Sequence, residues 1–296
     1  MTLLQQQEPR QLTYSTDVGS VVNWPLPQLL KAVPGLKGLV PAESQEELPG
    51  ILQEVGANVK AFFENFPNTV SVERISMGQR TRDENTAEIH TQKFQYLALA
   101  HPLKSGVRLD EYRTDAKGEP VEIGGPGGDY FVTKGFASMS LHFHPAYQAD
   151  STFRYLGRQV VNKRQTYVVA FAQRPQVARV VGKIDLPGLP IFVLNQGIAW
   201  IDSSTRQILR LRTDLLTSKE DIGPSRETTE IEFQEVQFKE SSQVLWLPRE
   251  VLVTAVWKGR TYLNRHTYSN FKLFTVGIEL KVAAPEGTPP DPQNPN

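Results

Sequence analysis

Residues 197–212 read GIAWIDSSTRQILRLR, and this stretch decides the fold class. Apolar residues stand on both sides of a polar centre, Asp202-Ser203-Ser204-Thr205. The side-chain oxygens of such residues bond to nearby backbone groups and favour turns. Two short apolar runs joined by a turn are typical of paired strands, so residues 197–212 predict a β-hairpin.

The rest of the chain carries further short runs that are rich in β-branched and aromatic residues and are separated by turn-rich segments. About ten antiparallel strands are predicted in this way. We expect them over residues 69–75, 91–100, 109–113, 141–144, 165–172, 191–201, 207–212, 228–238, 250–257 and 266–276.

One long helix is expected before the strands, over residues 44–66. Apolar side chains recur there at intervals of three and four residues, which places them on one helix face. Ser44 and Glu47 fit a capping box at its start, and Pro67 stops it because proline lacks a backbone N–H. Gly56 opposes the helix, since glycine costs a helix interior up to about 1 kcal/mol.

A curved sheet and one long helix pack most economically when the apolar helix face fills the concave side. We therefore expect a mainly β (α+β) fold, a curved antiparallel sheet or incomplete β-barrel wrapped around the N-terminal helix. The single half-barrel domain is expected over residues 44–276. Residues 1–43 predict an irregular lead-in with at most a short helix, and the proline-rich residues 277–296 predict a disordered tail.

Composition excludes several classes of function. Lys plus Arg and Asp plus Glu both number 32, so the formal net charge is zero and no overall field attracts nucleic acid. The absence of cysteine excludes disulfides, a thiol nucleophile and an acylated N-terminal cysteine. No apolar run reaches the ~18 residues that a membrane-spanning helix needs.

His142 and His144 form the sharpest enzyme-like pattern. In a strand over residues 141–144, alternate side chains share a face, so the two imidazoles would lie side by side as metal ligands do. A metal site would need more ligands from neighbouring strands. The remaining histidines are His90, His101 and His266. The pattern predicts an alternative function, a metal-dependent β-barrel enzyme.

Other catalytic patterns are weaker. Residues 135–139 lack the final glycine of a G-x-S-x-G elbow. Glu230 and Glu232 alternate with apolar residues, which is typical of a solvated strand face. We therefore assign no catalytic residue, no metal ligand and no cofactor, and expect a protein that is not an enzyme.

Three segments carry a family resemblance. They are Trp200-Ile201-Asp202-Ser203-Ser204-Thr205 with the following Arg210, Thr228-Thr229-Glu230-Ile231-Glu232-Phe233, and Leu247-Pro248. Together with the order of predicted elements over residues 45–276, they resemble periplasmic lipoprotein carriers and outer-membrane lipoprotein-sorting proteins. The resemblance implies an incomplete β-barrel, covered by helices, whose apolar interior binds acyl chains.

An apolar interior suits acyl chains because burying them yields about 0.8 kcal/mol per CH₂. The resemblance therefore implies an extracytoplasmic lipid- or lipoprotein-binding protein, of the carrier or sorting type, with an apolar cavity. Chosen for apolarity and position, the expected lining residues are Phe62, Phe63, Phe66, Trp200, Leu211, Phe233, Val253 and Trp257.

The implied partners are acyl chains or a lipoprotein, with room for an envelope protein partner and for peripheral membrane contact. The implied location is the periplasm or cell envelope. Residues 1–10 lack the basic and apolar regions of a secretory signal, so we expect the signal to have been removed or to lie before this start. A third function remains open, a structural envelope module whose sheet edge pairs with a partner.

Overall fold

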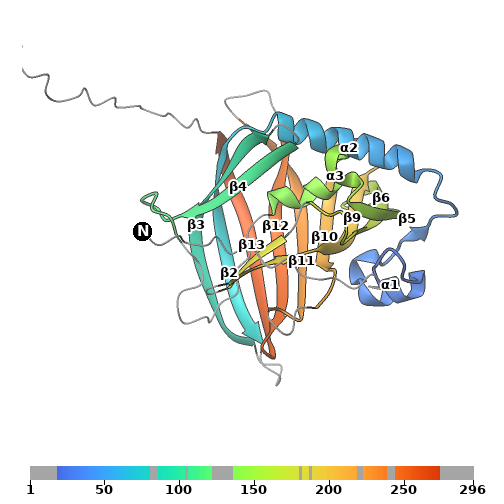
Figure 1. The fold of residues 1–296 in the computed structure, drawn as a ribbon. Helices are drawn as coiled ribbons and strands as arrows, with labels where there is room; N and C mark the ends of the chain where they lie inside the picture. Colours follow the sequence, from blue (N-terminus) through green and yellow to red (C-terminus); the bar gives the residue numbers. More distant parts are fainter. Residues whose placement is uncertain are drawn as a thin grey trace, which may run out of the picture.

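The computed structural model describes residues 19–80, 86–103, 106–121, 136–179, 182–186, 189–218, 223–238 and 244–273. Its main element is an 11-stranded antiparallel sheet that curves strongly and stays open (Figure 1). In spatial order the strands are β1 (Val40–Pro41), β5 (Ser151–Val161), β6 (Arg164–Gln173), β9 (Asn195–Asp202), β10 (Ile208–Leu215), β11 (Arg226–Gln237), β12 (Val244–Trp257), β13 (Arg260–Leu273), β2 (Thr69–Arg80), β3 (Thr86–Leu103) and β4 (Gly106–Thr114). The expected mainly β fold with a curved antiparallel sheet is confirmed.

The hairpin predicted from residues 197–212 is β9 and β10. The two strands are antiparallel, with Leu211 opposite Ala199 and Arg212 opposite Ile198. A smaller sheet pairs β7 (Gly182–Leu186) with β8 (Leu189–Val193), so the single strand expected over 191–201 is in fact parts of β8 and β9.

Strand β5 is not among the strands predicted from the sequence. A register shift between Tyr155 and Gly157 interrupts its alternation. Gly157 has φ +136°, and a Cβ there would lie 2.0 Å from the carbonyl oxygen of Val40 on β1. Only glycine allows this approach, and a glycine within a strand hides the sequence signal.

The helices are α1 (Leu26–Ala32), α2 (Leu48–Glu64) and α3 (Pro145–Gln148), with 3₁₀ helices η1 (Pro34–Leu36) and η2 (Ala137–Phe143). Helix α2 is the predicted long helix, but it begins at Leu48, without a side-chain cap. The capping box expected from Ser44 and Glu47 is wrong. Proline has no backbone N–H and is tolerated only in the first turn of a helix. A helix that began at residue 44 would place Pro49 beyond its first turn, where a backbone N–H is required.

The predicted strand over residues 141–144 is also wrong, because these residues belong to η2 and its end. His144 is extended (φ −66°, ψ 134°) and precedes Pro145, the first residue of α3. A residue before proline is pushed out of the helical region, which ends η2 there. The alternation of residues 141–144 was too short to outweigh the effect of Pro145 on the backbone of His144.

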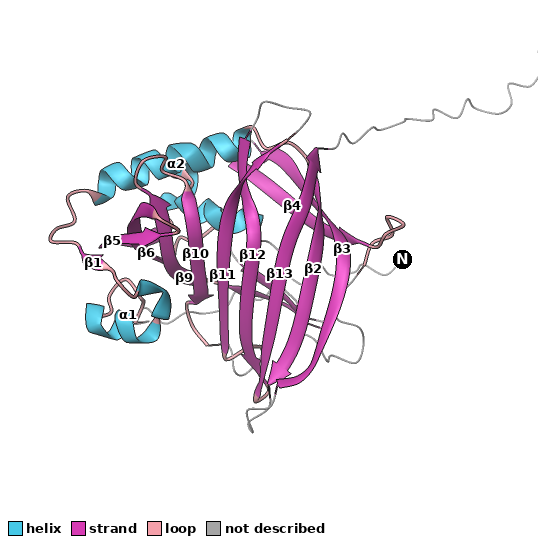
Figure 2. Cartoon of the chain, turned by 180° about the vertical axis from the view of Figure 1, so that it is seen from behind, coloured by secondary structure: helices cyan, strands magenta, loops and turns pink. Residues whose placement is uncertain are grey.

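Apolar cores lie on both faces of the sheet. The helices α2, η2 and α3 form a layer on the concave face, whereas α1 lies beside β1 and β5 at one end (Figures 1 and 2). In β9, Ala199 and Ile201 belong to the concave core, and Ile198 and Trp200 to the core beneath α1 and η1. This alternation follows from side chains pointing to opposite faces of a strand.

The expected lead-in contributes α1, η1 and β1, and β1 pairs with β5 through Val40 and Pro41. Residues 1–18 and the expected disordered tail over 277–296 lie outside the described residues. Within the described ranges, no helix combines the length and apolarity needed to span a membrane.

Candidate ligand site beneath the helical layer

Helix α2 turns an apolar face toward the concave core. Its buried residues Ile51, Val55, Val59 and Phe63 follow the helical repeat that the sequence shows. They join one cluster with side chains from the centre of the sheet and from η2. Its members include Val169, Phe171, Leu211, Ile231, Val251 and Val253 of the sheet, and Leu141 and Phe143 of η2.

Gly56 lets α2 approach η2 and α3 closely. A Cβ at this position would lie 2.5 Å from Nε2 of Gln148, 3.2 Å from the carbonyl oxygen of Phe143 and 3.3 Å from Cγ of Pro145. The Gln148 amide donates hydrogen bonds to the carbonyls of Leu52 and Phe143, both at 2.8 Å, and so ties α2 to η2. The glycine that opposed the helix prediction is therefore explained by this contact.

We expect Gly56→Ala to lower the free energy of unfolding by about 1–2 kcal/mol, because the added methyl displaces Gln148 and crowds a backbone carbonyl. A methyl group on Gly50 of the same helix would meet nothing within 4 Å, so Gly50→Ala is the matched control. It is expected to stabilise by up to about 1 kcal/mol through helix propensity. Urea unfolding of both variants measures the change in the free energy of unfolding. If Gly56→Ala stabilised the protein as Gly50→Ala is expected to do, the close contact at Gly56 would be contradicted.

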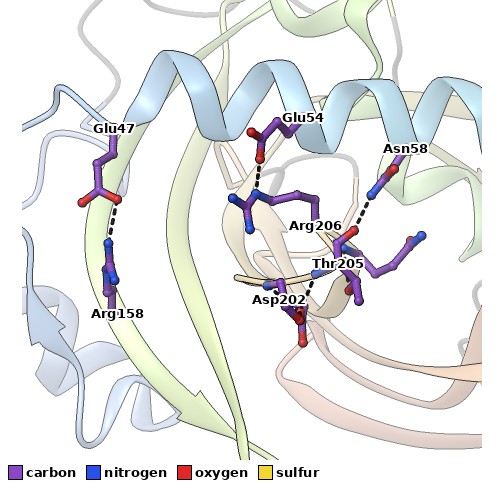
Figure 3. A network of polar contacts seen from close by, with 9 residues as sticks. Glu47, Glu54, Asn58, Arg158, Asp202, Thr205 and Arg206 are labelled. Atoms are coloured by element: carbon purple, nitrogen blue, oxygen red, sulfur yellow. Dashed lines mark hydrogen bonds and ion pairs between the residues drawn. The ribbon is translucent and has the colours of Figure 1, made fainter.

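Polar contacts join one flank of α2 to β5 and to the turn between β9 and β10 (Figure 3). Glu54 pairs with Arg206, and the Asn58 amide donates to the carbonyl of Thr205 at 2.7 Å. Near the start of the helix, Glu47 accepts from Arg158 at 2.8 Å. We call these three contacts the latch. About half of the Glu54 and Glu47 side chains is exposed, and surface ion pairs contribute only ~0–1 kcal/mol each.

Asp202 orders the turn between β9 and β10, which contacts α2 through Thr205 and Arg206. Its carboxylate accepts from the backbone N–H of Ser204 and of Thr205, both at 2.8 Å, from the Ser204 hydroxyl at 2.6 Å, and from Arg164. Burial alone would raise the pKa of Asp202, but these hydrogen bonds outweigh burial and hold the pKa well below its usual range. The polar centre of the sequence motif thus presents Thr205 and Arg206 to α2.

A small pocket lies beside the latch, between the helical layer and the sheet. Its free volume is about 30 Å³, room for roughly two water molecules. The lining residues are Asn58, Val59 and Phe62 of α2, Ala137 and Ser140 of η2, Arg206, Gln207 and Ile208 around the turn, and Phe233, Trp246 and Pro248 of the sheet. Ligand pockets usually measure about 300–1,000 Å³, so side chains largely fill this space in the present conformation.

Six of the eight residues expected to line a cavity lie in or against the concave core, and two of these six line the pocket. Phe63, Phe66, Leu211 and Val253 are buried in the concave core, and Phe62 and Phe233 pack against it and line the pocket. The Phe62 ring makes edge contacts with Phe63 and Phe66, at centroid distances of 5.0 and 5.1 Å.

The structure places the two expected tryptophans elsewhere. Trp200 lies on the opposite face, in the core beneath α1, where its Nε1–H donates to Gln159 at 2.8 Å. Trp257 ends β12, nine positions beyond Pro248 of the pocket, a distance of roughly 30 Å along a strand. The Lys258 ammonium lies over the Trp257 ring, 4.7 Å from its centroid.

The two histidines of the metal alternative do not share a strand face. His142 is buried with its ring 4.8 Å from that of Phe171, and burial lowers its pKa to about 4. His144 uses Nδ1 to accept the N–H of Ala146 at 3.1 Å. Among the described residues, no group of three or more His, Cys, Asp or Glu side chains is arranged to hold a metal ion.

A buried polar cluster on β2, β4 and β13 was missed by the sequence reasoning. Glu73 is 0% exposed and accepts hydrogen bonds from Arg113, His266 and Tyr268. We call these four residues the Glu73 cluster. Glu73 lies on the same face of β2 as the buried Ile75 and Met77, because the three residues alternate along the strand. The inward direction of its side chain could therefore be predicted from the sequence of β2. Its partners could not be identified without the register of the other strands.

No family model matches the chain, and no curated protein matches it. Among solved structures, a domain from Vibrio parahaemolyticus described as an outer membrane lipoprotein-sorting protein is similar, with 12% identity, a TM-score of 0.41, and coverage of 77% of this chain and 94% of that one. A DUF1329 family protein from Desulfovibrio piger shows 10% identity and a TM-score of 0.39, covering 76% and 92%. Lipoprotein LppX of Mycobacterium tuberculosis shows 10% identity and a TM-score of 0.24, covering 75% and 95%.

The identities are low, and what this chain binds has to be argued from its own side chains.

Proposed function

We propose that this protein binds acyl chains, free or attached to a lipoprotein, between the helical layer and the concave face of the sheet. It acts outside the cytoplasm as a carrier- or sorting-like protein and not as an enzyme. The observation that supports this most is the contrast across α2. Its inner face packs on a continuous aliphatic and aromatic surface, whereas its flank is held by the latch, in which about half of the Glu47 and Glu54 side chains is exposed.

The burial and ion-pair free energies favour insertion of an acyl chain between α2 and the sheet. An acyl segment of about ten methylenes yields roughly 8 kcal/mol on burial. Because the apolar face of α2 stays covered, by the acyl chain in place of the sheet, most of its own burial is retained. The latch opposes opening by only ~0–1 kcal/mol per ion pair. The small pocket that Phe62 and Phe233 help to line lies between the two layers.

Catalysis has weaker support. The Ser71 hydroxyl and His266 Nε2 are both buried without a hydrogen-bond partner among the described residues, a state that also fits a nucleophile and a base before substrate binds. However, His266 lies opposite Ile75, four positions from Ser71, which separates them by roughly 13 Å along the strand. They cannot form a nucleophile–base pair.

The experiment is native mass spectrometry of protein exported with an added signal peptide, followed by organic extraction. An added mass that extracts as lipid is expected, and delipidated protein should take up a fluorescent fatty acid. A bare mass without probe uptake contradicts the proposal and favours a structural module that pairs through the edge strands β1 or β4. An added mass that matches a transition metal favours the histidine-based enzyme.

A further inference from the structure

The Glu73 cluster fixes the protonation of His266. The Glu73 carboxylate receives Arg113 Nε at 2.5 Å and Nη2 at 2.9 Å, the Tyr268 hydroxyl at 2.9 Å, and His266 Nδ1 at 2.8 Å. Burial alone would raise the pKa of Glu73, but hydrogen bonds from His266 and Arg113 lower it to about 2, so the carboxylate is ionised. An ionised carboxylate only accepts hydrogen bonds, so Nδ1 carries the proton.

The other ring nitrogen of His266 is then a pure acceptor. Burial lowers the pKa of His266, and the Arg113 guanidinium already balances the charge of Glu73, so the imidazole is neutral. His266 is 0% exposed, and its Nε2 has no hydrogen-bond partner among the described residues. Buried polar atoms of this kind are rare in folded proteins, and each one requires an explanation.

The position of the ring gives this explanation. His266 packs edge-on against Phe136, with ring centroids 4.9 Å apart. Phe136 immediately precedes η2, whose Ala137 and Ser140 line the small pocket under α2. Phe136 therefore connects the start of η2, which lines the pocket, with the imidazole ring of His266.

We propose that His266 Nε2 is the polar end of the ligand site and accepts a hydrogen bond from a hydroxyl or amide N–H of an amphiphile whose tail lies beneath the helical layer. This inference rests on the proposed function and adds the ligand class: a neutral lipid with a donor close to its acyl chain, such as a monoacylglycerol. Esters without a hydroxyl leave Nε2 unpaired. A site built around a buried hydrogen-bonding atom discriminates against such analogues.

The test compares two ligands of equal chain length, monopalmitoylglycerol and methyl palmitate, by displacement of a fluorescent fatty acid. Wild-type protein is expected to bind monopalmitoylglycerol at least about tenfold more tightly. His266→Phe should remove that preference while it leaves methyl palmitate binding within about twofold. His101→Phe is the control, because it removes an imidazole that is 44% exposed, pairs with Asp110 and lies outside the Glu73 cluster, so the preference should persist.

Each outcome has a distinct meaning. Equal binding of both lipids by the wild type overturns the inference and leaves the proposed function standing, whereas binding of neither lipid nor of the fluorescent probe refutes the proposed function itself. If His266→Phe does not fold, ¹⁵N spectra of histidine-labelled wild type decide. The Nε2 resonance of His266 should shift with monopalmitoylglycerol and not with methyl palmitate, and an unchanged resonance overturns the inference.

Discussion

Cross-linking α2 to the turn between β9 and β10 is expected to abolish lipid uptake. The chain contains no cysteine, so Glu54→Cys with Arg206→Cys introduces one addressable pair where an ion pair now joins helix and turn. A short bis-maleimide then makes the latch permanent. The free volume of about 30 Å³ beneath the helix is far smaller than an acyl chain, so we expect α2 to move when one binds. Uptake of a fluorescent fatty acid should fall at least about tenfold.

The control has the same chemistry at another surface pair. Arg265 and Glu250 join the neighbouring strands β13 and β12 at 2.8 Å, away from α2. Cross-linking Arg265→Cys to Glu250→Cys should leave uptake unchanged. Each unlinked double variant should also bind the probe normally, because exposed ion pairs contribute little to stability. Normal uptake by the α2-linked protein would show that the ligand enters by another route or not at all.

The sequence predicted what local patterns control. The hairpin β9–β10 follows from its polar turn, and α2 follows from the three- and four-residue spacing of its apolar face. The inward side of α2 was therefore predictable, and Phe62, Phe63 and Phe66 do lie at or against the concave core. These features need no knowledge of distant residues.

Features set by long-range packing could not be predicted. Trp200 was expected to line the cavity, but every residue of β9 is buried, because α1 and η1 cover the face opposite to α2. A strand buried on both faces carries no polar alternation that would reveal which face is which. The latch and the Glu73 cluster likewise join residues from distant parts of the chain, such as Glu54 with Arg206 and Glu73 with His266.

Arg113→Met is expected to destabilise the protein by about 3–5 kcal/mol, the usual cost of leaving a buried charge without its partner. The Glu73 side chain is 0% exposed, and that of Arg113 is 7% exposed. Without the guanidinium, the donors that remain to the carboxylate among the described residues are Tyr268 and His266. Urea unfolding measures the change, and Arg265→Met is the matched control. The Arg265 side chain is 60% exposed in its pair with Glu250, so its loss should cost less than about 1 kcal/mol.

Glu73→Gln combined with Arg113→Met separates lost charge balance from lost packing. The neutral amide that replaces the carboxylate can still accept from Tyr268 and His266 and no longer needs a counter-ion, so the double variant should be more stable than Arg113→Met alone. A double variant that is as unstable as the sum of both single changes would mean that Arg113 acts by filling space. A rescue would show that the cluster holds a single negative charge in balance, the condition under which His266 stays neutral and keeps Nε2 available to a ligand.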